Sequence, residues 1–391
     1  MMGNWKTCTI GDLGTVVGGA TPSTKKPENY SAGTISWITP KDLAGFSGRF
    51  ISRGDRNITE QGLRSCSTQL MPAHTVLFSS RAPIGYIAIA DQEVCTNQGF
   101  KSVVPNENTD YMFLYYLLKY NKDRIENLGS GTTFKEVSGS TMRGIEVSVP
   151  DSIVEQRQIA SVLSVLDEKI EKNTEVNGNL QEQAFSLFER LFSQSKSGMC
   201  MLNEIAELNP KRQLAKGIIA KCIDMSQLST STSFPNGWEM KPYNGGMRFT
   251  NGDTIIARIT PCLENGKTAF INFLDDSEVA FGSTEYIVLA SKGDYPAEFF
   301  YCLARYPSFV DYAVKNMNGS SGRQRVSADT LGKYLLPRIT EDEMAMFRNT
   351  VNAMFKEMQI NSLENIRLSA LRDTLLPRLM SGELDISNLD L

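Results

Sequence analysis

Residues 154–194, VEQRQIASVLSVLDEKIEKNTEVNGNLQEQAFSLFERLFSQ, and residues 341–381, EDEMAMFRNTVNAMFKEMQINSLENIRLSALRDTLLPRLMS, decide the architecture of this 391-residue chain. Both stretches are long, rich in polar residues and nearly free of glycine and proline. In the first, spacings of three and four alternate through Ile159, Leu163, Leu166, Ile170, Asn173, Asn177, Leu180, Ala184, Leu187 and Leu191. Such a narrow stripe over four heptads predicts a coiled-coil helix.

The second stretch repeats the first at an offset of 188 residues. The corresponding positions are Phe347, Val351, Met354, Met358, Asn361, Asn365, Leu368, Arg372, Leu375 and Leu379. Nine of these ten positions keep their chemical character, and Arg372 is the exception. Pro377 predicts that this second helix ends near Leu376, because proline removes a helical hydrogen bond and disfavours helix in the residue before it.

Polar residues interrupt both stripes at the same place, at Asn173 and Asn177 and again at Asn361 and Asn365. Asparagine at a core position of a coiled coil fixes helix–helix register at some cost in stability. If the two helices pack antiparallel, Asn173 faces Asn365 and Asn177 faces Asn361, and we expect this arrangement. The alternative is that each stripe packs only on its own globular domain.

The segments that precede the helices also repeat, more faintly. Residues 129–138, GSGTTFKEVS, parallel residues 318–327, NGSSGRQRVS. Short β-branched and aromatic runs predict strands at 75–78, 85–90, 101–104 and 254–259, and residues 110–120 and 296–304 predict short helices. The predicted fold is α/β: two mixed α/β domains separated by two long helices packed as an antiparallel coiled coil, in a pseudo-two-fold internal repeat. The predicted segments are 1–152, 153–196, 197–338 and 339–391.

Charge is distributed unevenly along the chain. The net charge of −4 divides into +2 for residues 1–150, −3 for 151–200, +1 for 201–338 and −4 for 339–391. A near-neutral domain can still bind DNA if its basic residues gather on one face. No 18-residue apolar run or signal peptide is present, and the seven scattered cysteines lack a Cys-x-x-Cys spacing. We therefore expect a cytoplasmic protein with reduced thiols and no membrane partner.

Residues that could perform chemistry are few. His74 is the one histidine, so it would have to serve any Ser-His or Cys-His mechanism or His-based metal site, and a lone histidine beside a turn is more often structural. Gly266-Lys267-Thr268 lacks the preceding glycine of a phosphate-binding loop, because Pro261 stands there. Asp167-Glu-Lys169 lies on the predicted helix. We expect no catalytic residue, no metal ligand and no cofactor bound by this chain.

Binding residues are more numerous. Several predicted turns place Arg or Lys beside Asn, Gln, Ser or Thr, residue types that pair with base edges and phosphates. The candidate DNA-binding residues are Lys25, Lys26, Ser80, Arg81, Asn97, Gln98, Thr133 and Lys135 in the first half, and Lys211, Arg212, Arg258, Thr284, Arg323, Gln324 and Arg325 in the second. For each residue alone, the alternative is that it merely suits a turn. Recurrence at matching points in both halves favours binding for the set.

These features, taken together, resemble a known family, the specificity subunits of type I restriction–modification enzymes. The resemblance covers essentially the whole chain. It rests on Gly19-Ala-Thr-Pro-Ser-Thr-Lys25, Ile38-Thr-Pro-Lys-Asp-Leu43, Leu77-Phe-Ser-Ser-Arg-Ala-Pro-Ile-Gly85, Thr96-Asn-Gln-Gly-Phe-Lys101, Glu155-Gln-Arg-Gln-Ile-Ala160, Leu166-Asp-Glu-Lys-Ile170 and Leu376-Pro-Arg-Leu-Met-Ser-Gly-Glu-Leu384.

The resemblance implies that each globular half is a target recognition domain for one half of a bipartite, asymmetric site in double-stranded DNA. It implies that the helices act as a spacer and dock two methyltransferase subunits, which bind S-adenosylmethionine and flip the target adenine. ATP-using restriction subunits can join such a complex. Two alternatives stay open on the residues alone: an assembly scaffold whose globular halves bind protein, and a cryptic enzyme built around His74 or a cysteine.

Overall fold

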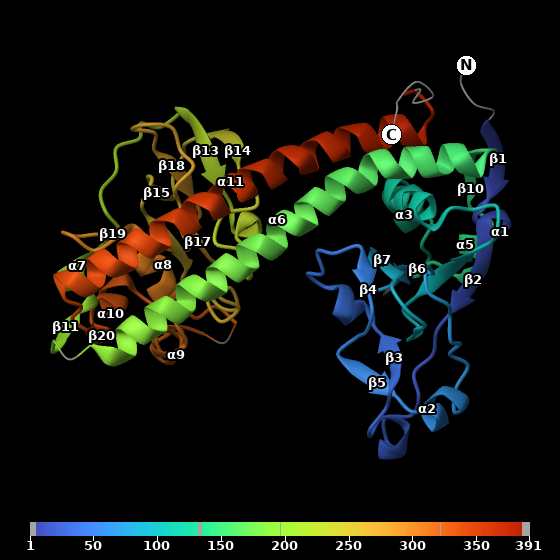
Figure 1. The fold of residues 1–391 in the computed structure, drawn as a ribbon, viewed down its shortest axis with the longest axis horizontal. Helices are drawn as coiled ribbons and strands as arrows, with labels where there is room; N and C mark the ends of the chain where they lie inside the picture. The colour runs from blue at the N-terminus through green and yellow to red at the C-terminus, as the bar shows by residue number, and fades with distance from the viewer. Residues whose placement is uncertain (1–4, 132–134, 196, 321, 385–391) are drawn as a thin grey trace. The chain divides into compact units, whose positions relative to one another are not determined.

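The computed structural model describes residues 5–131, 135–195, 197–320 and 322–384. The chain divides into two compact units (Figure 1). Unit 1 comprises Met1–Glu171 and Ser369–Leu391, and unit 2 comprises Lys172–Leu368. The boundaries between the two units therefore fall within the two long helices. Each unit contains one strand-rich segment and a part of each helix.

Unit 1 is a mixed α/β unit. Its strands are β1 (Trp5–Thr9), β2 (Gly14–Gly18), β3 (Ile35–Ile38), β4 (Phe50–Ile51), β5 (Arg56–Ile58), β6 (Val76–Ser80), β7 (Ile84–Ala90), β8 (Cys95–Thr96), β9 (Lys101–Pro105) and β10 (Glu146–Pro150). Its short helices are α1 (Ile10–Leu13), η1 (Pro27–Asn29), η2 (Pro40–Leu43), α2 (Glu60–Arg64), α3 (Tyr111–Tyr120), α4 (Lys122–Asn127) and α5 (Gly139–Arg143). The sheet orders are β2-β9-β6-β7-β4, β5-β3-β8 and β1-β10.

Unit 2 repeats this order of elements. Its strands are β11 (Met199–Met201), β12 (Ala206–Leu208), β13 (Ile219–Ile223), β14 (Glu239–Pro242), β15 (Met247–Phe249), β16 (Thr254–Ala257), β17 (Thr268–Phe270), β18 (Ala280–Gly282), β19 (Tyr286–Ser291) and β20 (Leu335–Pro337). Its short helices are α7 (Leu202–Ile205), η3 (Met225–Gln227), α8 (Ala297–Arg305), α9 (Pro307–Lys315) and α10 (Ala328–Gly332). The sheet orders are β12-β19-β16-β17, β14-β13-β18-β15 and β11-β20.

The two units share the central part of their topology, although their two main sheets have five and three strands in unit 1 and four and four in unit 2. The central strands β9-β6-β7 of unit 1 correspond to β19-β16-β17 of unit 2. In each unit a parallel strand pair lies in a second sheet, β3 with β8 and β13 with β18. The internal repeat predicted from the sequence is thus present at the level of the fold.

Local sequence accounts for the predicted elements. The β6 residues VLFSS are all buried, and they form the middle of the largest sheet. Asp110 caps α3, because its side chain accepts a hydrogen bond from the backbone N–H of Phe113 at 2.9 Å. β16 ends at Ala257, two residues before the predicted end, because Ile259 leaves the sheet and pairs with Arg325 instead.

The long helices are α6 (Ile153–Gln194) and α11 (Glu341–Met380), and they pack together (Figure 1). Within unit 2, the Asn173 side chain donates to Asn365 Oδ1 at 2.9 Å, and the Asn361 side chain donates to Asn177 Oδ1 at 3.0 Å. Residue numbers rise along one helix as they fall along the other, so the helices run antiparallel. The mixed α/β fold with two packed long helices is therefore confirmed.

The stripes also enter the cores of the units. In unit 2, Phe347, Val351 and Met358 lie in one apolar cluster with Ile287 of β19 and Phe299 of α8. In unit 1, Ile159 and Leu163 of α6 and Leu379 of α11 join the cluster that contains α3. The two packing modes that the sequence left open thus occur together, because residues of each stripe contact both the other helix and the core of a unit.

Pro377 does not end α11 at Leu376. The helix continues to Met380, and the backbone N–H of Ser381 donates to the carbonyl of Pro377 at 3.0 Å. Proline here removes one helical hydrogen bond near the helix end, where few further bonds depend on it. The expectation of an early end was wrong for this reason.

Polar contacts fasten α6 to the strand-rich part of unit 1. The buried Arg49 guanidinium donates from Nε and Nη2 to the Glu171 carboxylate at 3.0 and 2.8 Å. Burial alone would lower the pKa of Arg49, but the hydrogen bonds and charge of Glu171 outweigh it and raise that pKa. Among the described residues, no helix is both long and apolar enough to cross a membrane.

Candidate nucleic-acid interface

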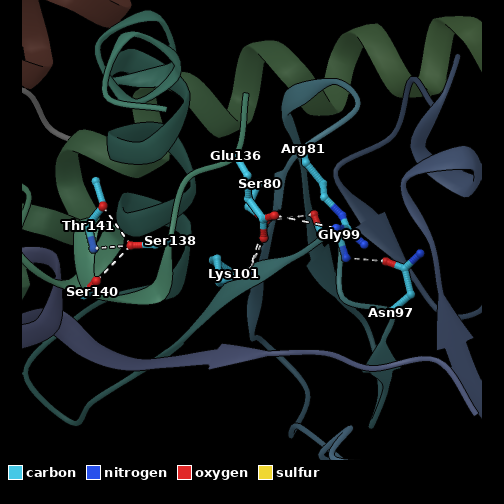
Figure 2. Close-up of polar contacts among 9 residues, drawn as sticks. All are labelled: Ser80, Arg81, Asn97, Gly99, Lys101, Glu136, Ser138, Ser140 and Thr141. Atoms are coloured by element: carbon cyan, nitrogen blue, oxygen red, sulfur yellow. Dashed lines mark hydrogen bonds and ion pairs between the residues drawn. The ribbon is translucent and has the colours of Figure 1, made fainter. Parts of the chain in front are cut away.

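In unit 1 the predicted turn residues meet at the end of β6. The backbone N–H of Ser80 donates to the carbonyl of Gly99 at 2.7 Å, and the Ser80 hydroxyl donates to the same oxygen at 3.2 Å (Figure 2). The Asn97 side chain accepts from the Gly99 N–H at 2.8 Å, which closes the turn before β9. A Cβ on Gly99 would lie 2.8 Å from the Pro40 ring, so the turn requires glycine at this close approach.

Charged side chains gather beside this turn. The Glu136 carboxylate lies 3.6 Å from Nη1 of Arg81 and 3.3 Å from Nζ of Lys101, as Figure 2 shows. Lys101 Nζ also donates to the Ser80 hydroxyl at 3.4 Å. Arg81, just after β6, and Glu136 are paired by an isolated antiparallel backbone bridge. Three segments distant in sequence therefore bring two bases and one acid together.

A hydroxyl group adjoins this charged cluster. Ser138 caps α5, because its Oγ accepts from the backbone N–H of Thr141 at 3.0 Å. The same Oγ lies 2.8 Å from the hydroxyls of Ser140 and Thr141 (Figure 2). Hydroxyls of this kind can donate to phosphate or base oxygens.

Unit 2 has the same pattern of backbone hydrogen bonds with different side chains, and we call this shared pattern the backbone frame. The Arg258 N–H donates to the Glu285 carbonyl at 2.9 Å, as Ser80 does to Gly99 in unit 1. The Glu285 N–H donates to the Ser283 hydroxyl at 3.1 Å, so Ser283 takes the place of Asn97. Arg258 thus corresponds to Ser80, and Glu285 corresponds to Gly99.

Glu285 is the acidic centre of the unit 2 cluster. Arg325 donates from Nε to both Glu285 oxygens, at 3.0 and 2.9 Å, and from Nη2 to Oε1 at 2.7 Å. These hydrogen bonds, with the charges of Arg325 and Arg258, lower the pKa of Glu285. Ser327 caps α10 by accepting from the Thr330 N–H at 3.0 Å, as Ser138 caps α5.

The equivalent positions carry opposite charges. Glu136 pairs with the backbone of Ser130, and Arg325 pairs in the same way with Asn318. Glu136 and Arg325 therefore occupy the same place in the two frames, one as an acid and one as a base. Each cluster nevertheless contains two bases and one acid: Arg81, Lys101 and Glu136 in unit 1, and Arg258, Arg325 and Glu285 in unit 2.

Other predicted residues lie close to these clusters. Gln98 follows Asn97 in the turn, and its side chain accepts from the Thr21 hydroxyl. This contact joins the turn to the loop that carries the exposed Lys25 and Lys26. In unit 2, Thr284 lies exposed in the turn between Ser283 and Glu285, and Gln324 accepts from the Thr260 N–H through its carbonyl. Lys135 is exposed, and Thr133 lies outside the described residues.

Lys211 and Arg212 are not part of the unit 2 cluster. The Arg212 guanidinium donates to the Asp253 carboxylate at 2.8 Å. Asp253 precedes β16 and Arg258 follows it, so a strand of four residues lies between the two sites. Burial raises the pKa of Asp253 and outweighs its hydrogen bonds from Thr250 and Arg212. Arg212 is thus held within the fold, whereas Lys211 is exposed.

Comparison with known proteins gives the family of the chain. It is 31% identical over 422 aligned residues to the type I restriction enzyme MjaIX specificity subunit of Methanocaldococcus jannaschii, covering 99% of this chain and 95% of that protein. The chain belongs to the type I restriction enzyme specificity subunits. Residues 2–181 match the family described as type I restriction modification DNA specificity domain.

Two further comparisons agree with this family. The HindI specificity subunit of Haemophilus influenzae is 21% identical over 368 residues, which cover 73% of this chain and 80% of that one. In fold, this specificity subunit resembles the crystal structure of a type I restriction–modification S subunit from M. genitalium. That likeness has a TM-score of 0.61 at 18% identity and covers 96% of both chains. The relatives are named specificity subunits, which are a non-catalytic family.

Sequence reasoning missed several members of the clusters in this specificity subunit. Lys101 appears there only in a predicted strand and in a family motif, and neither Glu136 nor Glu285 is a candidate, because only basic, amide and hydroxyl side chains were sought. A signal was present in the repeat, since the parallel between GSGTTFKEVS and NGSSGRQRVS places Glu136 opposite Arg325. Glu136 and Arg325 thus mark a position where the two halves differ in charge.

His74 and four of the cysteines, which the sequence left as candidates for catalysis, pack within this specificity subunit. The His74 ring stacks on Tyr111 with centroids 4.1 Å apart. Cys95, Cys200, Cys222 and Cys302 are buried free thiols, and burial raises the pKa of Cys95 to about 12. Across residues 5–131, 135–195, 197–320 and 322–384, no group of three or more His, Cys, Asp or Glu side chains could hold a metal ion.

Proposed function

We propose that this chain is the DNA-reading subunit of a type I restriction–modification complex. Each strand-rich segment reads one half of a bipartite, asymmetric site in double-stranded DNA. The long helices set the distance between the two readings and dock two methyltransferase subunits, and restriction subunits can be added. S-adenosylmethionine and ATP belong to those partner subunits, and the complex works in the cytoplasm.

The repeated turn cluster carries this proposal. The same pattern of backbone hydrogen bonds occurs in both units, and in each it gathers two bases and one acid beside hydroxyl and amide groups. Arg and Lys donate to phosphates and to guanine, whereas Asn and Gln pair with adenine. The surrounding domains are near neutral, so local clusters rather than bulk charge would supply the attraction for DNA.

Different side chains on one frame suit an asymmetric target. Ser80 and Gly99 of unit 1 are replaced by Arg258 and Glu285 in unit 2, and Glu136 is replaced by Arg325. A protein with two such units would bind two different half-sites, because each base pair presents its own pattern of donors and acceptors in the major groove.

The test is to co-express the chain with a methyltransferase subunit and to map adenine methylation across genomic DNA. A bipartite motif with a fixed gap is expected. The matched control is the methyltransferase subunit expressed alone, which should yield no such motif. Methylation that stays absent, or that follows no bipartite sequence, contradicts the proposal and favours a protein-binding scaffold.

A further inference from the structure

The Arg325 guanidinium is held along its Nε–Nη2 edge and at Nη1. Its Nε and Nη2 donate to the Glu285 carboxylate, and its Nη1 donates to the carbonyl of Arg323 at 3.1 Å. A guanidinium has five N–H groups, and these contacts use three of them. Among the residues that the structure describes, the other two, one on each Nη, have no acceptor.

The support beneath Arg325 is rigid. Its backbone exchanges two hydrogen bonds of 2.9 Å with Asn318, and it bridges to Ile259 after β16. The Arg325 side chain is 39% exposed, and that of Glu285 is 26% exposed. The guanidinium is therefore fixed by its inner edge while part of it stays accessible to a ligand.

The available edge fits two acceptors that lie side by side. Guanine O6 and N7 have this arrangement, and so do two oxygens of a phosphate. The charge of Arg258 also acts on Glu285 and, with that of Arg325, offsets the charge of the carboxylate, so an electron-rich ligand is not repelled. Holding the arginine in advance reduces the side-chain entropy that binding would otherwise cost.

We propose that Glu285 is a positioning residue that presents the outer edge of Arg325 to a pair of acceptors on DNA. The inference rests on the proposed function, because it assigns the reading of one half-site to unit 2. Unit 1 carries its acid at the equivalent of Arg325, as Glu136, and its bases on β9 and beyond β6. Its donors therefore approach DNA from other segments of the frame.

The experiment compares full-length variants in complex with the methyltransferase subunit. The variants are Glu285→Gln, Arg325→Lys and the exchanged pair E285R/R325E, with Glu207→Gln, an exposed residue of the same unit, as the control. Each complex is assayed for its methylated motif, for its affinity for a duplex with the wild-type motif at several salt concentrations, and for its melting temperature.

If the acceptors belong to guanine, Arg325→Lys should reduce discrimination at one base pair about 5- to 150-fold. Glu285→Gln should give a smaller loss at the same base pair, and the other half of the motif should not change. If the acceptors belong to a phosphate, affinity should fall equally for all duplexes, with little change in the salt slope because lysine keeps the positive charge but loses the paired N–H groups. Either result supports positioning by Glu285 and identifies the source of the acceptors.

The variant E285R/R325E distinguishes two roles of Glu285: positioning Arg325 for DNA, and forming an ion pair that only stabilises the fold. It should keep the melting temperature near that of the wild type, since the ion pair is rebuilt, but it should not recover the wild-type motif or affinity. Recovery of all three would overturn the inference, and so would an unchanged motif and affinity in both single variants. A wild-type complex without a bipartite motif would instead refute the proposed function.

Discussion

At position 372 the heptad stripe carries a charge because the position that faces it does. Arg372 donates to the Asp167 carboxylate at 2.7 Å, and the Tyr116 hydroxyl donates to the other oxygen at 2.7 Å. The positions equivalent to Asp167 and Arg372 in unit 2 are Phe355 and Ala184, and both are fully buried. The repeat therefore has a polar triad at this position in unit 1 and apolar side chains at the equivalent position in unit 2.

Replacing Arg372 by Met should destabilise unit 1 by about 3–5 kcal/mol, because it leaves the buried Asp167 carboxylate without its cation. The triple variant Y116F/D167L/R372M should recover most of this loss, since no buried charge remains. Differential scanning calorimetry of the full chain measures both effects. Arg367→Met, at an exposed position of the same helix, is the control. A triple variant as unstable as the single one would contradict this account.

The Glu285–Arg325 pair should make unit 2 sensitive to acid. Hydrogen bonds from Arg325 and the charges of Arg325 and Arg258 lower the pKa of folded Glu285 below its unfolded value of about 4.3. The pair therefore stabilises fully above about pH 4.3 and loses this contribution as pH falls through the lower folded pKa.

At pH 7, Glu285→Gln should unfold more easily than the wild type by less than about 1 kcal/mol, because the pair is partly exposed. The difference between the two unfolding midpoints should shrink as the pH falls below about 4. A difference between the midpoints that grows on acidification would show that folding does not lower the pKa of Glu285.

At the scale of elements, the middle of the helix pair is polar. Asn173, Asn177, Asn361 and Asn365 bond to one another across it, and Asn177 also donates to the Ser362 hydroxyl at 3.2 Å. These bonds form only when the helices are aligned at one register. Their role in fixing that register stays a prediction.

Asn177→Leu should cost about 1–3 kcal/mol, because the buried amide of Asn361 then lacks its acceptor. The double variant N177L/N361L should regain that stability, since both polar groups are gone. Thermal unfolding measures the change, and Asn179→Leu on the exposed face should stay within about 0.5 kcal/mol of the wild type. Equal losses in the single and double variants would speak against a paired contact.

The helices and most central strands could be predicted from the sequence, because their periodic patterns follow directly from burial. The helical stretches 154–194 and 341–381 chosen from the sequence coincide closely with α6 and α11. The ion pairs could not be predicted in this way. Glu285 and Arg325 are 40 residues apart, and only the fold brings them together. Arg212 is of a residue type that commonly binds DNA, but only the tertiary structure shows that its side chain pairs with Asp253.

At the scale of the whole molecule, two units with the same central topology carry different side chains on the same frame. Replacing residues 197–338 with the matching segment of another specificity subunit should therefore change one half of the methylated motif and leave the other half and the gap unaltered. Genome-wide methylation mapping checks this. The reciprocal exchange of residues 1–152 should change the other half, and a change in both halves after either exchange would contradict independent reading.

The two ends of the described chain belong to the same unit. A Cβ on Gly382, just beyond α11, would lie 3.0 Å from the Trp5 ring of β1, so these segments touch within unit 1. We therefore expect the cores to tolerate a change in the order in which the gene encodes them. A circular permutant that begins at Ser197, ends at Ser195 and joins the present termini through a short linker should fold and keep the wild-type motif. Gene rearrangement could then reorder the two half-site readers without redesigning their packing, and a permutant that fails to fold would exclude this route.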